Sequence, residues 1–288
     1  MRLFYSLLTR RHGFKMAISA VSARYLLAQT SELAEAIPAR PSHALTGAQF
    51  ADSVLDIDRH EREQAILNEL LHGNLPDFLR KLVPLKLRRA GADGKIITVT
   101  LFVMPEYLAI GSDVDFLRIP MNLHTAVAVA EHFGFLLPTR KIVDSIYAHA
   151  LYRFAPQPLP AGPRMTSTEY YQMHNSMIDE QSEHRGFPFG VLVAGHKKDV
   201  VVSNRLIAHP GQIAIYGWHR GIGEPIQPLS TVHGAGYADY SHGIRLVSRM
   251  AIMNGKLRSV TDILLDPASA GVLSDEGPIR VGLALRGV

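Results

Sequence analysis

The sequence predicts an α+β protein with a helix-rich N-terminal half that contains a short sheet, and a strand-rich C-terminal half. In the first half, apolar residues recur at helical spacing behind residues that cap helices. Residues 95–104 are β-branched and partly alternate, as expected of a strand. After Gly186 the apolar segments are short, and Gly, Pro and His separate them.

The N-terminal half begins with a helix that Thr46 is expected to cap, because Gln49 follows at the spacing of a capping box. Asn122 is expected to cap a later helix, and Pro138 to open another in its first turn. Pro84 is expected to end a short helix. The elements predicted in this half are helix 50–71 with a break near 56–58, helix 76–82, strands 95–104 and 106–111, a polar turn at 112–115, helix 122–132 and helix 138–153.

The segment 155–163 contains four prolines and is the best candidate for an internal boundary. It would separate a helical or α+β region, 46–154, from a β-rich region, 164–288, that carries the candidate site. Thr166 or Ser167 is expected to cap a polar helix. The elements predicted in this half are that helix, ending near 183, and strands 191–194, 200–203, 212–216 and 244–247.

The first 36 residues form a separate region. Thr9-Arg10-Arg11-His12-Gly13-Phe14-Lys15 resembles a twin-arginine export signal, with one additional residue between the Arg pair and Phe14. A mildly apolar segment, 16–28, follows, and Ala34-Glu35-Ala36 matches a small-x-small cleavage site. The resemblance implies export to the periplasm and a mature start near Ile37. The alternatives are a cytoplasmic protein with an N-terminal helix, or translation from Met16.

Composition excludes several classes of function. The 288-residue chain has 30 basic and 26 acidic residues, a net charge of +4, and no cysteine. Disulfides, thiolate metal sites and a cysteine nucleophile are therefore excluded. The basic clusters have no interleaved aromatic residues, which argues against nucleic acid as a partner. No apolar run reaches the roughly 18 residues that a membrane-spanning helix needs.

The stretch 237–245 holds an acid, two phenols, a hydroxyl, an imidazole and a guanidinium within nine positions. A fold rarely needs so many hydrogen-bonding side chains at one point, so we expect the site here. Imidazoles titrate near neutrality and suit general acid–base chemistry. The candidate catalytic residues are His196, His219, His233, Asp239, Ser241 and His242, and the candidate substrate-binding residues are Lys197, Trp218, Tyr240 and Arg245.

Within this set the roles follow from side-chain chemistry. Ser241 is the candidate nucleophile, but neighbouring residues on a strand face opposite sides, so His242 is not its natural base. His233 or His219 would have to approach it through the fold. Asp239 would orient an imidazole, and the planar guanidinium of Arg245 would bind a substrate carboxylate or phosphate.

The run Ser241-His242-Gly243-Ile244-Arg245-Leu246 resembles the Ser-His-Gly-Cys-Ile-Arg-Leu signature of L,D-transpeptidases, which crosslink peptidoglycan. Segment 212–216 is similar to the family's upstream strand, and His233-Gly234 to its His-Gly pair. The family's nucleophilic cysteine would fall between Gly243 and Ile244 and is missing, which excludes thiol acyl transfer. The resemblance implies a related β-rich scaffold.

Segment 233–239 resembles, one residue short, the His-x-x-Gly-x-Ala-x-Asp signature of zinc D-Ala-D-Ala peptidases. The resemblance implies that His233, Asp239 and His242 bind Zn²⁺ and leave an open position for a water with a lowered pKa. That family also needs a histidine further downstream, and none follows His242. His196 or His219 would have to take its place.

Three functions therefore remain open. The first is a hydrolase or group-transfer enzyme that acts without a thiol on an extracytoplasmic polymer such as peptidoglycan, or on a small anionic substrate. The second is a non-enzymatic protein that binds a ligand or glycan in a cleft lined by histidine and aromatic residues around Trp218. The third is a polar network that only stabilises a long loop.

Overall fold

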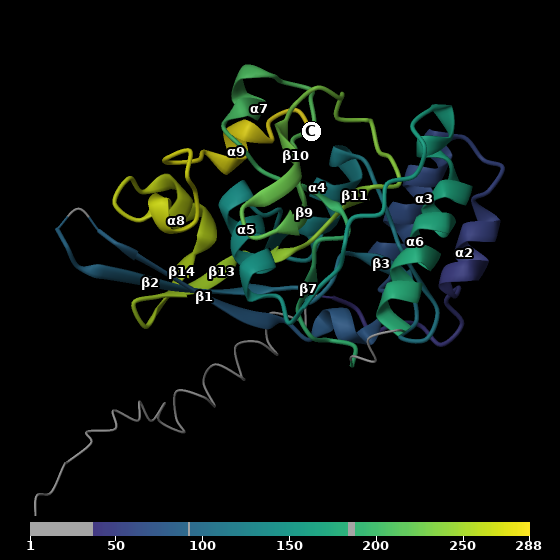
Figure 1. Cartoon of the computed structure of the whole chain (residues 1–288), viewed down its shortest axis with the longest axis horizontal. Coiled ribbons are helices and arrows are strands. Elements are labelled where there is room, and N and C mark those ends of the chain that lie inside the picture. Colours follow the sequence, from purple (N-terminus) through teal and green to yellow (C-terminus); the bar gives the residue numbers. More distant parts are fainter. Residues whose placement is uncertain (1–36, 92, 184–187) are drawn as a thin grey trace, which may run out of the picture.

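A computed structural model of the chain describes residues 37–91, 93–183 and 188–288. The export signal expected at 1–36 lies outside the described residues. The fold is α+β, with helices concentrated in the N-terminal half and strands dominant in the C-terminal half, as predicted. Helices α2, α3 and α6 gather at one end of the molecule, and two β-hairpins project from the other (Figure 1).

The helices begin largely where capping residues predict them. Thr46 forms a complete capping box with Gln49, Asp58 caps the helix after the predicted break, and Asn122 caps the next long helix. No helix among the described residues is long and apolar enough to cross a bilayer. The helices are α2 Gly47–Ser53, α3 Arg59–Leu71, α4 Leu123–His132, α5 Arg140–His149, α6 Thr168–Glu183, α7 Arg205–Ala208, α8 Val260–Leu265 and α9 Val281–Ala284, with 3₁₀ turns η1 Asp77–Arg80, η2 Pro163–Thr166 and η3 Ala270–Val272.

The strands are short and more numerous than the sequence predicts. Segment 106–111 is a strand only over its last three residues, and of 244–247 only Val247 is in a strand, β12. The strands are β1 Val83–Ala90, β2 Ile96–Val103, β3 Ala109–Gly111, β4 Phe116–Arg118, β5 Phe135–Leu136, β6 Tyr152–Arg153, β7 Val193–Ala194, β8 Lys198–Val200, β9 Ile215–Gly221, β10 Glu224–Ser230, β11 His242–Gly243, β12 Val247–Ser248, β13 Met250–Met253 and β14 Lys256–Ser259.

The short helix predicted over 76–82 is the 3₁₀ turn η1, which ends before Pro84, and Pro84 itself lies in strand β1, which the sequence did not predict. Leu85 and Leu87 are buried while Lys86 and Arg88 are exposed, which is the alternation of a strand with one face on the core. β1 pairs only with β2 and is therefore an edge strand. Proline is tolerated there because an edge strand has backbone N–H groups that need no partner in the sheet.

The main sheet has the order β14-β13-β2-β12-β5, with β1 also paired to β2. Its strands come from both sides of the proline-rich segment 155–163, and one cluster of buried apolar residues extends through both halves. The second sheet has the order β10-β9-β8-β11. Its parallel pair, β8 and β11, places segment 237–245 beside segment 196–199.

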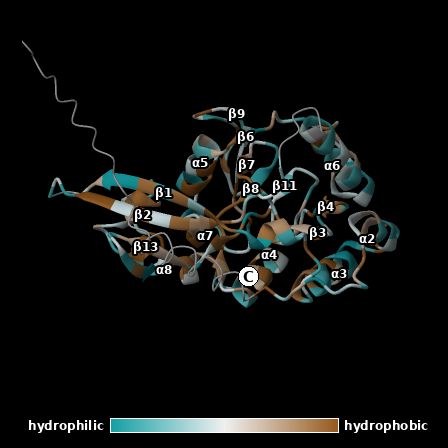
Figure 2. Ribbon diagram, turned by 90° about the horizontal axis from the view of Figure 1, so that it is seen from below, coloured by the Kyte–Doolittle hydropathy of each residue, from teal (hydrophilic) through white to brown (hydrophobic). Residues whose placement is uncertain are grey.

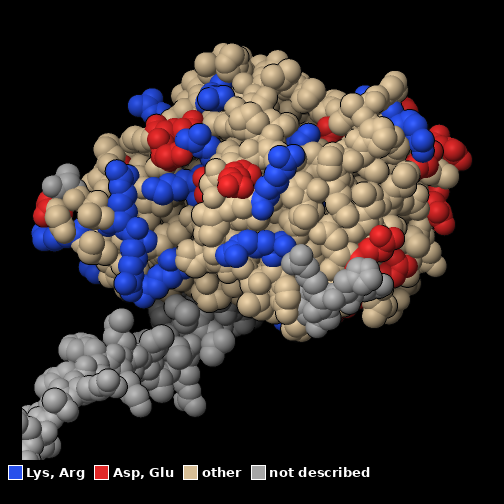
Figure 3. All heavy atoms as spheres, viewed as in Figure 1, with Lys and Arg blue, Asp and Glu red and all other residues tan. Residues whose placement is uncertain are grey.

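The two hairpins, β1–β2 and β13–β14, extend from the body of the molecule (Figures 1 and 2). In Figure 2 a hydrophilic β1 lies beside a more hydrophobic β2. Lys and Arg side chains gather over this end of the surface (Figure 3). On the face shown, the hairpin end is therefore rich in positive charge.

Candidate functional site

The site is organised by the contact between β8 and β11. His242 pairs with Lys198 in the parallel register, and the Lys198 backbone N–H donates to the Ser241 carbonyl at 2.7 Å. Gly243 has no side chain at the point of closest approach, where a Cβ would lie 2.7 Å from the Lys197 Cβ and from the Tyr107 ring. The glycine therefore lets Lys197 pack directly against the 241–243 backbone.

Asp239 is the centre of the hydrogen-bond network in this segment. Its Oδ1 accepts from the Ser241 hydroxyl at 2.5 Å and from the Ser241 backbone N–H at 2.8 Å, and its Oδ2 accepts from the Tyr237 hydroxyl at 3.1 Å. Burial favours the neutral carboxyl, but the charge of a protonated His242 and the Ser241 hydrogen bond together hold the pKa of Asp239 below its usual value. At neutral pH Asp239 is therefore a carboxylate.

Lys197 lies beside this network with only 1% of its surface exposed. Its Nζ donates to the Tyr240 carbonyl at 2.6 Å. Burial, and next the positive charge of Arg118, lower the pKa of the Lys197 amine to about 7. The hydrogen-bond partner of the Lys197 amine is thus a neutral carbonyl, and the pKa of the amine lies well below that of an exposed lysine.

His242 is completely buried, and neither ring nitrogen makes a hydrogen bond within the described residues. Its Nε2 lies 3.9 Å from Asp239 Oδ2, which is too long for a hydrogen bond. Burial lowers the pKa of His242 to about 4, against the opposing effect of Asp239. The imidazole is therefore neutral at pH 7.

His233 forms the outer edge of the cluster. It is half-buried, and its ring stacks on Tyr237 with centroids 4.1 Å apart, while Tyr237 contacts His242 edge-on at 5.7 Å. In the described part of the chain, no three His, Cys, Asp or Glu side chains are grouped to hold a metal ion. The predicted ligands His233, Asp239 and His242 do not form such a set, because Tyr237 packs against both imidazoles and bonds the carboxylate.

Trp218 and Tyr240 are buried, and both contact His174, a residue that the sequence did not point to. His174 of α6 is buried, and its ring lies 5.1 Å from Tyr240 and 6.2 Å from Trp218. Neither of its nitrogens has a hydrogen-bond partner among the described residues, and burial lowers the pKa of His174. Helical periodicity alone could not show that α6 turns this imidazole toward Tyr240.

The backbone at Trp218 is strained. Its φ is +55°, which a bulky side chain rarely adopts, and the preceding Gly217 also has a positive φ, +106°. Such strain is concentrated at functional sites, because the surrounding structure must maintain it. Trp218 is nevertheless buried, so it belongs to an aromatic cluster and does not line an open groove.

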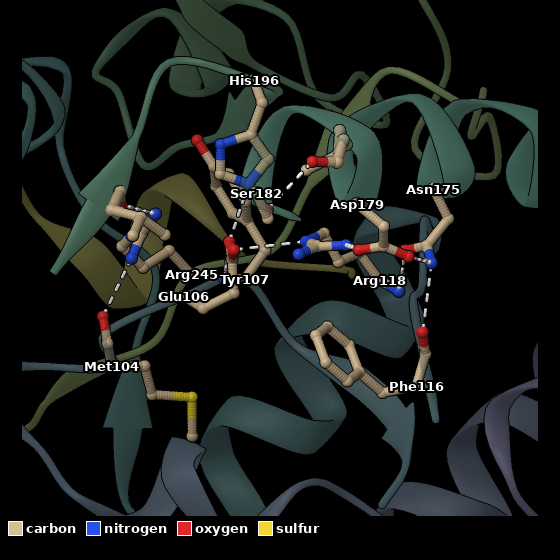
Figure 4. Close-up of polar contacts among 12 residues, drawn as sticks. Met104, Glu106, Tyr107, Phe116, Arg118, Asn175, Asp179, Ser182, His196 and Arg245 are labelled. Atoms are coloured by element: carbon tan, nitrogen blue, oxygen red, sulfur yellow. Dashed lines mark hydrogen bonds and ion pairs between the residues drawn. The ribbon is translucent and has the colours of Figure 1, made fainter. Parts of the chain in front are cut away.

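His196 and His219 are each held by a carboxylate outside segment 237–245. The His196 Nε2 lies 2.8 Å from Glu106, which also pairs with Arg118 at 3.2 Å (Figure 4). The His219 Nε2 lies 2.9 Å from Asp144. The fold thus brings together His233, Asp239, Ser241 and His242, and it gives the other two histidines separate partners. Glu106 and Asp144 stand in no motif that would have identified them.

Arg245, the predicted anion anchor, is completely buried. Its guanidinium donates to the carbonyls of Met104 at 2.9 Å and Val193 at 2.8 Å, and it lies 4.3 Å above the Tyr107 ring (Figure 4). These contacts join three separate segments of the chain. The geometry gives Arg245 a role in holding the scaffold of the site together.

The site is closed to solvent in this conformation. Ser241 and His242 have no exposed surface, and none of five hollows on the described surface is lined by residues of 237–243. The half-buried Tyr237 and His233 cover it from outside.

Comparison of the chain with protein-family models, with curated proteins and with solved structures finds no match. The function must therefore be argued from the side chains of the site.

Proposed function

We propose that the chain is a hydrolase or group-transfer enzyme that acts without a thiol on an extracytoplasmic polymer such as peptidoglycan. One observation carries the proposal. The Ser241 hydroxyl is bonded to the Asp239 carboxylate at 2.5 Å, and the next carbonyl along the chain, that of Tyr240, accepts from the Lys197 amine at 2.6 Å. A nucleophile, an orienting carboxylate and a titratable amine thus converge on three consecutive residues.

Ser241 is the nucleophile in this proposal, and Lys197 is the base. A base is most effective when its pKa lies near the working pH, and the pKa of about 7 meets that condition. In this proposal the Lys197 amine first leaves the Tyr240 carbonyl and the Ser241 hydroxyl turns from Asp239 to it. The Ser241 oxygen then attacks the substrate carbonyl carbon, and its proton passes to the uncharged Lys197 amine. The resulting ammonium returns the proton to the leaving amine. Water, or a second amine, then attacks the acyl-enzyme and restores the free hydroxyl.

Tyr237 controls entry in this scheme. Its hydroxyl donates a hydrogen bond to Asp239 Oδ2 at 3.1 Å. Burial, together with the charge of Asp239, raises the pKa of Tyr237 to about 12, so the phenol stays neutral and remains a donor. When Tyr237 and the stacked His233 move outward, the Asp239–Ser241 pair becomes accessible. The neutral His242 stays buried next to the Asp239–Ser241 pair.

The choice of polymer rests on two resemblances. Residues 241–246 are similar to the L,D-transpeptidase signature, and residues 9–15 are similar to a twin-arginine export signal. Both point to the cell envelope, where peptidoglycan supplies amide bonds between short peptides. The absence of cysteine directs the chemistry to the hydroxyl of Ser241.

The test is release of soluble muropeptides from purified peptidoglycan, followed by mass spectrometry, together with covalent labelling by a fluorophosphonate probe. We expect S241A to lower release on the order of 10³-fold or more and to abolish labelling. S203A is the matched control, because Ser203 is also fully buried and its hydroxyl donates to Glu276 at 2.8 Å. Labelling of S241A at the parental level, or no release by the parent chain, would refute the proposal.

A non-enzymatic binding protein is the second candidate, and one observation favours it. A hollow of about 390 Å³ between α2 and α6 is large enough for a small ligand. Phe116 and Phe189 line it with polar groups such as Asn175, but no histidine does. If this hollow carries the function, A48W, which fills it from α2, should abolish binding of muropeptide fragments in calorimetry, and S241A should bind them as the parent does.

A further inference from the structure

One face of the main sheet is uncovered at the end where the hairpins project. Leu85, Leu87 and Val99 point to the other face and are buried, and α5 and η3 pack on these strands. On the uncovered face the register places Lys86 beside Thr100 and Arg88 beside Thr98. The same face continues through Ile252 and Leu257, which pair across β13 and β14. We call this surface the hairpin face.

The hairpin face combines exposed apolar and basic side chains. Ile96 is 59% exposed and Leu257 is 44% exposed, and the register places both on this face. Lys86 and Arg88 are exposed on the neighbouring edge strand β1, so the basic side chains lie beside the aliphatic ones on the same face. The face is therefore amphipathic, although no helix forms it.

The charge of this surface is not neutralised within the molecule. Among the described residues, Lys86 and Arg88 form no ion pair. Lys95 at the hairpin tip pairs with Asp93 at 3.1 Å, with both side chains exposed. Figure 3 shows Lys and Arg gathered over this end. An occupant of the face must therefore be negatively charged.

We propose that the hairpin face binds an anionic lipid surface. Basic side chains around exposed aliphatic ones fit the boundary between anionic headgroups and acyl chains. A second copy of the chain would place Lys86 and Arg88 against the same cations, which disfavours self-association. A hydrophilic polyanion would make no use of Ile96 and Leu257. The chain would lie on the membrane through two hairpins and need no spanning segment.

The experiment is sedimentation of the full chain with vesicles of phosphatidylcholine, alone or mixed with an equal part of phosphatidylglycerol. We expect binding to the mixed vesicles only, and weaker binding in salt on the order of 1 M. K86Q/R88Q should lower the partition coefficient about 30-fold, since each basic residue near an anionic surface contributes about a fivefold gain. R220Q/R286Q, which removes two exposed cations elsewhere, should change it less than about twofold.

The aliphatic residues distinguish a lipid from any other polyanion. I96S/L257S keeps the charge and should lower vesicle binding about tenfold or more. If this variant binds vesicles as the parent does, and the parent binds heparin with the same salt dependence, the face is a general polyanion surface and the proposal is wrong. Parental binding by K86Q/R88Q, or no binding to mixed vesicles, would also overturn it.

Discussion

The Ser241 hydroxyl donates to Asp239 Oδ1 at 2.5 Å, and the Ser241 backbone N–H donates to the same oxygen at 2.8 Å. A carboxylate that bonds the backbone two residues ahead forms a local turn, which needs only three consecutive residues. Lys197, in contrast, reaches the same place only through the pairing of β8 with β11. The site therefore joins a locally encoded pair to a group supplied by the tertiary fold.

Replacing Asp239 by asparagine tests the orienting carboxylate. Asparagine keeps the size but removes the negative charge that accepts from Ser241 and Tyr237. We expect D239N to lower kcat/KM on the order of 100-fold, and to lower the free energy of unfolding by about 1–3 kcal/mol. Muropeptide release and urea unfolding measure the two effects. An unchanged kcat/KM would show that Asp239 only stabilises the turn.

The titration of Lys197 predicts a pH profile for activity. With a pKa of about 7, the amine loses its proton as pH rises through neutrality, so activity should rise across that range. K197M should reduce activity and remove this rise. The profile of kcat/KM against pH for both proteins is the measurement. A parental profile that is flat near pH 7 would exclude Lys197 as the base.

The same residue predicts a pH dependence of stability. The folded pKa of about 7 lies below the ordinary lysine value of about 10.4, so between these values the unfolded chain binds a proton that the folded chain does not. The contribution of Lys197 to the free energy of unfolding therefore increases with pH across this window. K197M should lack that increase in urea unfolding and should gain stability relative to the parent near pH 6. Equal slopes for the two proteins would contradict this.

His242 predicts a loss of stability in acid. Its folded pKa of about 4 lies below the ordinary value of about 6.5, so the unfolded chain is protonated first as pH falls between them. This burial should account for a loss of about 3 kcal/mol in the free energy of unfolding over that range. H242Q cannot titrate and should lose correspondingly less. Parallel curves for H242Q and the parent would show that the imidazole is accessible to water.

Arg245 predicts a defect in folding rather than in binding. Lysine cannot donate to the Met104 and Val193 carbonyls at once, because it lacks the planar fork of arginine. We expect R245K to lower the free energy of unfolding by about 3 kcal/mol and to leave the KM of the remaining folded enzyme near the parental value. A raised KM with unchanged unfolding would instead support the anion anchor that the sequence suggested.

Local patterns predicted much of the secondary structure. The Thr46–Gln49 capping box and the Asn122 cap start their helices as expected, since a cap depends on residues three positions apart. The short helix ahead of Pro84 is present as η1, but the strand β1 that contains Pro84 was missed, because a proline that follows a helix is also compatible with an edge strand. β1 is an edge strand because β2 is the strand that it pairs with and no strand of the described residues pairs with its other side. A local sequence pattern does not show how many partners a strand has.

For the site, the sequence by itself determined that the chemistry uses no thiol, and it identified 237–245 as the densest group of functional side chains. His196, Lys197 and Asp199 are buried, although nothing in the local sequence of 196–199 predicts it. Only the parallel pairing of β8 with a strand more than 40 residues later decided this. Burial, and the pKa of about 7 that Lys197 acquires from it, depend on which distant segments exclude water, and periodicity along the chain carries no such information.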